Sequence, residues 1–159
     1  MNYIIRDSRR EDMVQVLELI RELAVFEKEE NAVDVTVADL EQSGFGKEKH
    51  FHCFVAEQED KIVGMALVYP RYSTWKGPII HLEDLIVTEK MRGSGLGTAL
   101  LNEVVNYGHK LGVKRISWEV LDWNEPAIDF YKSKGADVKR DWDVVHLDEK
   151  GIANYLANI

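Results

Sequence analysis

Apolar residues recur every three or four positions between residues 13 and 24, which places them on one face of an α-helix. Before this segment, Tyr3–Arg6 predicts a short strand. After it, Thr36–Leu40 predicts a weaker helix with Thr36 as its cap and Asp39 as the acid of a capping box, interrupted by Ser43–Gly46. The apolar face of the first helix comprises Met13, Val16, Leu17, Ile20, Leu23 and Ala24.

Three apolar runs then alternate with turn residues, a pattern typical of strands that follow one another in a sheet. They are Phe51–Glu57, Lys61–Tyr69 and His81–Val87. Residues 58–60 have the length of a hairpin connection, and Pro70 is expected to end the second strand. Residues 71–78 are expected to form a loop. Together these strands predict an antiparallel meander.

The second half of the chain alternates helical and extended patterns. A helix is expected to end near Gly112, a strand follows at Arg115–Leu121, and Asn124 caps a helix that runs to Gly135. Val144–Leu147 is expected to close the sheet, and Ile152–Ile159 predicts a short terminal helix. These units predict an α/β fold with a mixed, mostly antiparallel sheet flanked by helices.

Composition fits one globular domain over residues 1–159, because 45% of the residues are hydrophobic and 30% are charged. No apolar stretch approaches the ~20 residues of a membrane span and no leader pattern is present, so a cytoplasmic location is expected. The formal charge of −8 argues against nucleic-acid binding and favours a cationic substrate. Cys53 is expected to be buried and apolar, and the histidines form no metal-binding pattern.

A loop containing Gly93, Gly95 and Gly97 joins the apolar residues 85–87 to the helix that follows. Glycine permits positive φ and close approach of a ligand, and a helix start offers unpaired N–H groups, so this loop predicts a phosphate site. It lacks the Gly-Lys-Ser/Thr of a Walker loop, and its glycines do not complete the dinucleotide fingerprint. An ordinary strand-to-helix turn is the alternative for the loop taken alone.

The pattern Arg92-x-x-Gly95-x-Gly97 resembles the acetyl-CoA pyrophosphate loop of the GNAT family of N-acetyltransferases, and residues 124–136 resemble that family's second signature, N-x-x-A-x-x-F-Y-x-x-x-G-A/F. Residues 21–27, 44–46, 51–57 and 82–84 resemble its diamine acetyltransferases, the spermidine/spermine and thialysine Nε-acetyltransferases. Residues 72–77 and 121–124 are more similar to the thialysine branch, whereas 124–126 follow the spermidine branch. The resemblance implies the GNAT fold, with a splayed strand pair for acetyl-CoA, and a homodimer.

The same resemblance implies the residues that hold acetyl-CoA. The strand at 85–87 would pair with the pantetheine arm, as an extended ligand added to an open sheet edge. The glycine loop would hold the diphosphate, and the helix after Asn124 would complete the site. The residues implied are Leu85, Ile86, Val87, Arg92, Gly93, Ser94, Gly95, Leu96, Gly97, Thr98, Asn124, Pro126, Ala127 and Tyr131.

Two residues are expected to move protons. An alkyl ammonium, with a pKa of about 10.4, must lose a proton before it attacks a thioester, and the resemblance places Glu83 in the substrate site as the acceptor, through water. The departing coenzyme A thiolate must gain a proton, and the resemblance places Tyr131 beside the sulfur as its donor. The structural alternatives are a strand-edge surface acid for Glu83 and core packing for Tyr131.

The amine site implied by the resemblance comprises Phe26, Glu27, Ser73, Trp75 and Glu83, although Glu27 lies in an acidic run that is also typical of a solvated helix end. Ser73 stands where the spermidine branch carries an acid. We therefore expect thialysine, lysine or ornithine to be better acceptors than spermidine, with the Ser73 hydroxyl and Lys76 or Arg140 receiving the carboxylate. The alternatives are a protein or peptide acetyltransferase and a non-catalytic acetyl-CoA-binding module, although both Glu83 and Tyr131 are present.

Overall fold

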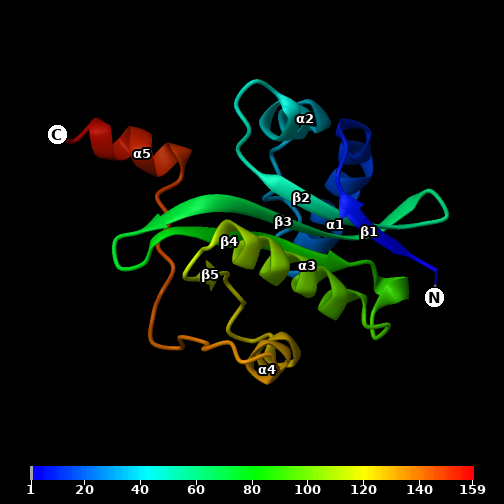
Figure 1. Ribbon diagram of the computed structural model, residues 1–159. Coiled ribbons are helices and arrows are strands. Elements are labelled where there is room, and N and C mark those ends of the chain that lie inside the picture. Colours follow the sequence, from blue (N-terminus) through cyan, green and yellow to red (C-terminus); the bar gives the residue numbers. More distant parts are fainter. Residues whose placement is uncertain (1) are drawn as a thin grey trace. The chain divides into compact units, whose positions relative to one another are not determined.

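The computed structural model describes residues 2–159 and comprises two compact units, which meet in sequence between Glu119 and Val120. The first unit is built on a sheet with strand order β1-β2-β3-β4-β5, in which only the β4–β5 pair is parallel. This arrangement confirms the predicted fold class (Figure 1). The strands are β1 (Ile4–Asp7), β2 (His52–Gln58), β3 (Lys61–Ser73), β4 (Gly77–Val87) and β5 (Ile116–Ser117).

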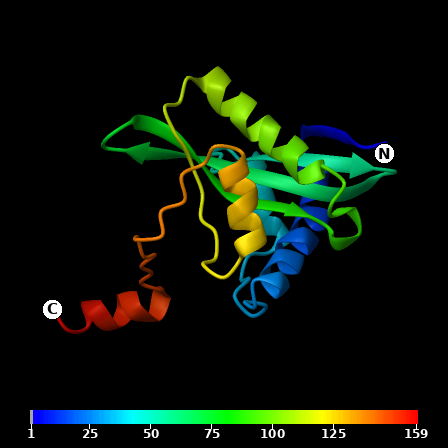
Figure 2. The same cartoon turned by 90° about the horizontal axis from the view of Figure 1, so that it is seen from below.

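Helix α1 covers one face of this sheet, with α2 packed beside α1, and α3 covers the other face, as Figures 1 and 2 show. The helices of the first unit are α1 (Met13–Phe26), α2 (Val37–Phe45) and α3 (Leu96–Leu111), with short 3-10 turns η1 (Arg10–Asp12) and η2 (Glu89–Met91). The second unit contains α4 (Glu125–Ser133) and α5 (Glu149–Leu156).

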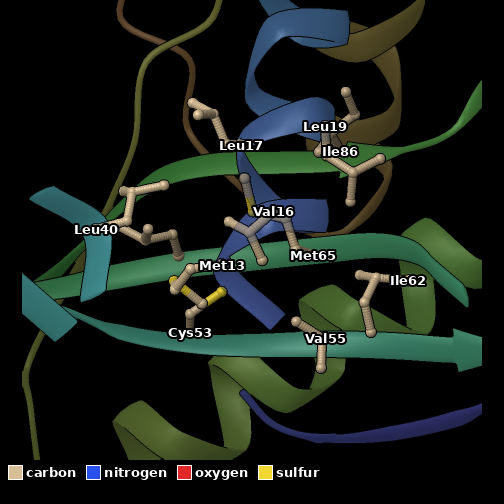
Figure 3. Close-up of a cluster of buried hydrophobic side chains, with 11 residues drawn as sticks. Met13, Val16, Leu17, Leu19, Leu40, Cys53, Val55, Ile62, Met65 and Ile86 are labelled. Carbon is tan, nitrogen blue, oxygen red and sulfur yellow. The ribbon is translucent and has the colours of Figure 1, made fainter. Parts of the chain in front are cut away.

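The main core lies between α1 and the sheet, where the apolar face predicted for α1 meets alternate residues of β2 and β3. Figure 3 shows Met13 and Val16 of α1 beside Cys53, Val55 and Met65 of the strands, all buried. Cys53 is 2% exposed, as expected, and burial raises the pKa of its thiol to about 12. This thiol is therefore no ready nucleophile at neutral pH.

The hairpin of β3 and β4 is longer than the sequence pattern predicted. Pro70 lies within β3, opposite Ile80, and only residues 74–76 connect the two strands. β2 reaches no further than the partner of Val68, so from Tyr69 onward β3 has a strand neighbour on one side only. Proline is tolerated there because a sheet edge does not require its missing N–H group.

Three other boundaries differ from the expectations. Helix α2 continues to Phe45, and Gly44 within it lies against the ring of Phe51, where an added Cβ would come within 2.6 Å. Strand β5 has two residues in place of the expected Arg115–Leu121. The segment 144–147 forms no strand, and Val145 is 88% exposed. A strand requires a neighbour for its backbone hydrogen bonds, which the local pattern of these segments could not reveal.

Candidate active site

Strand β4 loses its neighbour on one side beyond His81. β5 pairs only with Ile80 and His81, so residues 82–87 have β3 on one side and no strand on the other within the described chain. Leu85, Ile86 and Val87 lie on this stretch. Because main-chain groups of a strand alternate between its two sides, the open edge offers N–H and C=O groups to an extended ligand.

The glycine loop leads from this edge into α3. Gly93 and Gly95 have φ angles of 74° and 84°, and an added Cβ at either would meet no atom within 4 Å. Gly95 is the N-cap of α3, and no side chain caps the helix. The helical backbone bonds begin with Ala99 N–H donating to the Gly95 carbonyl, which leaves the N–H groups of residues 96–98 for a ligand. An open backbone cradle at a helix start fits a diphosphate.

Glu22 of α1, which was not assigned a role from the sequence, binds the residues that lead into this loop. Its carboxylate accepts hydrogen bonds from the Thr88 hydroxyl at 3.0 Å and from the Glu89 N–H at 2.9 Å, and it lies 3.7 Å from the Arg92 guanidinium. Arg92 also stacks over the ring of Phe26, 5.2 Å from its centroid. The glycine loop is therefore in contact with the end of α1, where Phe26 and Glu27 of the expected amine site lie.

Glu83 lies at a β-bulge of β4. Leu67 of β3 faces Asp84 and the next residue, Val68, faces Leu82, so Glu83 is the extra residue. Bulges of this kind are frequent beside active sites, because they change the direction in which a side chain points. The Glu83 side chain is 54% exposed, and Asp84 is half-buried. The bulge thus presents two consecutive carboxylates next to the open edge of β4.

Glu27 joins these two carboxylates in one negative cluster. Burial and the charges of Glu29 and Glu83 raise the pKa of Glu27. Burial and the charges of Glu83 and Glu27 raise the pKa of Asp84 to about 6. Asp84 was not assigned a role from the sequence, although a second carboxylate within an otherwise apolar strand was an available signal. The cluster favours a cation at this place.

Asp84→Asn is expected to stabilise the protein at high pH. The folded-state pKa of Asp84, about 6, exceeds its ordinary value of 3.8, so the folded chain binds this proton more tightly than the unfolded chain does. Stability is therefore lost as pH rises from about 4 through about 6. Above that range the buried charge costs on the order of 2 kcal/mol, which asparagine removes. Urea unfolding should show the largest gain at pH 8 and none near pH 4.

The matched control for this variant is Asp129→Asn, at an exposed position of α4. Its free energy of unfolding should change by less than about 0.5 kcal/mol at every pH. A gain for Asp84→Asn that is equal at pH 4 and pH 8 would show that the buried charge is not its cause.

His81 lies two residues before Glu83 on β4, between Tyr69 of β3 and Ser117 of β5. Its ring is buried, with Nε2 3.7 Å from a Glu83 carboxylate oxygen and Nδ1 2.8 Å from the Ser117 hydroxyl. The Arg71 guanidinium lies 3.3 Å from Nδ1 and can only donate, so Nδ1 is the acceptor and the neutral ring carries its proton on Nε2. Burial lowers the pKa of His81, which favours the neutral ring. The Tyr69 ring lies beside it, with centroids 5.2 Å apart.

Ser73 and Trp75 lie at the tip of the β3–β4 hairpin. The Ser73 hydroxyl oxygen accepts the N–H groups of Trp75 at 3.2 Å and Lys76 at 3.1 Å, so it shapes the turn. The Arg115 guanidinium lies 3.4 Å from the same oxygen. Trp75 is 76% exposed. Neither residue belongs to the carboxylate cluster.

The second unit carries the remaining predicted residues. The Asn124 side chain accepts the Ala127 N–H at 3.3 Å and so caps α4, with Pro126 in the first turn. Tyr131 is half-buried on this helix, its ring 5.4 Å from that of Phe130. The Arg140 guanidinium lies 3.6 Å from the Glu125 carboxylate. The local structure of the second signature therefore follows its sequence.

The described residues contain no group of three or more His, Cys, Asp or Glu side chains that could hold a metal ion. Among the same residues, no helix has both the length and the apolar character needed to cross a membrane.

Comparison with known proteins identifies the family. The acetyltransferase (GNAT) family model matches residues 13–136. The chain belongs to the GNAT acetyltransferase family. This acetyltransferase is 39% identical over 141 residues to the thialysine N-epsilon-acetyltransferase of Bos taurus, covering 84% of this chain and 83% of that protein. It is 33% identical over 120 residues to an L-ornithine N5-acetyltransferase of Arabidopsis thaliana, covering 75% of this chain and 50% of that protein.

Solved structures agree on the fold of this acetyltransferase. An integron cassette protein from the mobile metagenome of V. cholerae has a TM-score of 0.80 at 22% identity, covering 100% of this chain and 99% of that one. An aminoglycoside acetyltransferase from a soil metagenome has a TM-score of 0.76 at 21% identity, covering 92% and 97%. The expected family, fold and enzyme class are confirmed: the chain is an N-acetyltransferase.

Proposed function

We propose that this acetyltransferase moves an acetyl group from acetyl-CoA directly to the primary amine of a small diamine or lysine-like amino acid. The observation that carries the proposal is the cluster of Glu27, Glu83 and Asp84 beside the open edge of β4, since three carboxylates at the coenzyme strand favour a cationic acceptor there. The named relatives that act on thialysine and ornithine support the same acceptor class.

Acetyl-CoA supplies the activated acetyl group as a thioester. The main chain of Leu85–Val87 holds its extended arm, and the backbone of the glycine loop with the start of α3 holds its diphosphate. Arg92 and Ser94 line this loop, and the Ser94 hydroxyl donates to the Met91 carbonyl at 2.6 Å, which fixes the loop. Asn124, Pro126 and Ala127 complete the coenzyme site in the proposal.

Glu83 takes the proton of the acceptor ammonium, through water, because the neutral amine alone can attack. Nε2 of His81 lies 3.7 Å from the Glu83 carboxylate. Tyr131 protonates the departing thiolate. Phe26 and Glu27, at the end of α1, hold the acceptor from the other side, with Ser73 and Trp75 at the hairpin tip.

A panel of amines tests the proposal. Thialysine, lysine, ornithine, spermidine and a lysine-containing peptide amide are compared by release of free thiol from acetyl-CoA. We expect kcat/KM for the free small amines to exceed that for the peptide. A peptide that outperforms every small amine would favour a protein acetyltransferase instead, and thiol release from none of them would favour a non-catalytic acetyl-CoA-binding module.

Gly95→Val is expected to raise KM for acetyl-CoA strongly. Valine is poorly tolerated at a φ of 84°, and its side chain would fill the cradle in which we place the diphosphate. Gly112→Val is the matched control, because Gly112 caps the other end of α3 with a φ of 73° and also has open space around it. Both variants carry similar backbone strain, but only Gly95→Val should change KM. An equal KM in the two folded variants would contradict the coenzyme site.

Ser73→Asp is expected to shift the ratio of kcat/KM values from lysine-like amines toward spermidine. An aspartate can still accept the N–H groups of Trp75 and Lys76, so the turn is kept. It adds a negative charge where the far ammonium of a polyamine would lie. We expect the wild type to prefer lysine-like amines. A wild-type preference for spermidine of about tenfold, or 1.4 kcal/mol, would contradict the branch assignment and leave the acetyltransferase proposal intact.

We further propose that residues 1–159 form a single N-acetyltransferase domain, which acts as a cytoplasmic homodimer. The match of one family model across residues 13–136 supports the single domain, since it spans the boundary between the two units. The formal charge of −8 supports a small cationic substrate in place of a nucleic acid or an anionic membrane surface as partner.

A further inference from the structure

Two arginines that pair with no carboxylate lie on one face of the sheet. Arg6, Arg10, Arg92 and Arg140 each have a carboxylate oxygen within 4 Å. Among the described residues 2–159 the other four arginines, Arg9, Arg21, Arg71 and Arg115, form no such ion pair, and Arg71 and Arg115 are the two of these that lie on neighbouring rows of the sheet. In a chain with a formal charge of −8, two unpaired guanidinium groups in one place are unexpected.

The strand register places these two arginines side by side. Arg71 of β3 faces Ile79 of β4, and Ile79 precedes Ile80, which pairs with Ile116 next to Arg115. Their contacts show that both side chains lie on the same face. Arg71 reaches His81, whereas Arg115 reaches Ser73, which shares its sheet face with Arg71 because the two are two residues apart on β3.

This arginine pair is aligned with the carboxylate cluster. Along this face of β4, Glu83 comes first, then His81 with Tyr69 and Ser117, and then Ile79 between Arg71 and Arg115. The imidazole of His81 lies 3.3 Å from the Arg71 guanidinium and 3.7 Å from the Glu83 carboxylate. The negative Glu83 carboxylate and the positive Arg71 guanidinium are therefore separated by about the width of the His81 ring plus these two distances.

That separation fits an amino acid with an amine at the end of its side chain. The Cα–Nζ span of an extended lysine is on the order of 6 Å, at about 1.5 Å per bond along a zigzag chain. With its amine at Glu83, its carboxylate reaches the guanidinium groups, which bind carboxylates through two parallel hydrogen bonds. A diamine of the same length brings a second ammonium to the same two cations, so its binding is opposed.

We propose that Arg71 and Arg115 form a binding site for the α-carboxylate of the acceptor, which restricts this acetyltransferase to free amino acids with a terminal side-chain amine. The inference rests on the proposed function, because it requires the amine to lie at Glu83. It assigns the carboxylate to these two arginines in place of Lys76 or Arg140. It also excludes lysine within a protein chain, since that residue has no free α-carboxylate.

L-Lysine, L-lysinamide and cadaverine test the site, because the last two differ from lysine chiefly at the carboxylate. The wild type should acetylate lysine with kcat/KM at least about tenfold above either analogue, a preference of about 1.4 kcal/mol. Arg115→Gln and Arg71→Gln should each lower the value for lysine about tenfold and leave that for cadaverine unchanged or higher. Arg115→Lys, which keeps the charge but not the fork, should fall between. Arg10→Gln, an exposed arginine near Glu41, is the control.

Binding provides a second readout. The affinity of Nε-acetyl-lysine, measured by calorimetry without coenzyme, should fall in Arg115→Gln by a factor similar to that in kcat/KM, while KM for acetyl-CoA stays unchanged. A wild type that acetylates lysinamide as well as lysine would overturn the inference. The inference would also be overturned if Arg71→Gln lowered kcat/KM equally for lysine and cadaverine, because Arg71 would then act through His81 and not on the carboxylate. Failure to acetylate any amine would instead contradict the proposed function.

Discussion

Tyr131→Phe is expected to lower kcat by about 10²–10⁴-fold while KM for acetyl-CoA changes little, the range typical of losing a general acid. The phenol is needed only when the thiolate departs, and a phenol of pKa near 10 can protonate a thiolate whose thiol has a pKa of about 8.5 if it is held against the sulfur. Removal of the hydroxyl alone keeps the ring that lies beside Phe130. Steady-state kinetics with acetyl-CoA and a saturating amine give both constants.

The control for this variant is Tyr155→Phe, which removes the same group from an exposed tyrosine of α5. Its kcat should equal that of the wild type. Coenzymes with more acidic thiol leaving groups should partly restore Tyr131→Phe, because their thiolates need less protonation. If Tyr131→Phe turns over at the wild-type rate, Tyr131 has a packing role and water supplies the proton.

Glu83→Gln is expected to lower kcat/KM for the amine by a similar factor, about 10²–10⁴-fold at neutral pH. An ammonium with a pKa of about 10.4 is almost fully protonated there, so without the carboxylate the neutral amine is scarce. Its concentration rises tenfold per pH unit, so the defect should shrink steadily between pH 7 and pH 10. The measurement is kcat/KM for the amine across this range in wild type and variant.

Two further variants make this test specific. Glu18→Gln, at an exposed position on α1, should retain wild-type activity. Asp84→Asn should lower kcat/KM for the amine by less than Glu83→Gln does, because it removes one charge of the carboxylate cluster but keeps the proposed base. If Asp84→Asn is inactive while Glu83→Gln is active, then Asp84 and not Glu83 is the base. The pKa of Asp84, raised to about 6, would suit that role.

Features set by neighbouring residues could be predicted from the sequence. The periodic apolar face of α1, the capping box of Thr36 and Asp39, and the Asn124 cap are all present in the structure. The glycine loop is of the same kind, since Gly93 and Gly95 adopt the positive φ that glycine permits. Each depends on contacts within a few residues, which composition and spacing encode directly.

Features set by strand register could not be predicted in this way. Pro70 was expected to end β3 but lies at an edge where its missing N–H is harmless, and the segment expected as a strand at 115–121 shrinks to Ile116–Ser117. Both outcomes depend on which strands lie next to a segment. A local pattern specifies which side chains are apolar, but not where the neighbouring strand ends.

The sequence by itself determined the family and the glycine loop, because motifs at fixed spacing carry them, and its resemblance to that family supplied Glu83 and Tyr131 as candidates. Only the tertiary structure grouped Glu83 and Asp84 with Glu27, and only it placed His81 between Glu83 and Arg71. The physical reason is the pairing of β3 with β4. Its register places Arg71 and Tyr69 of β3 opposite Ile79 and His81 of β4, and its bulge lies at Glu83, so charged residues from separate strands become neighbours.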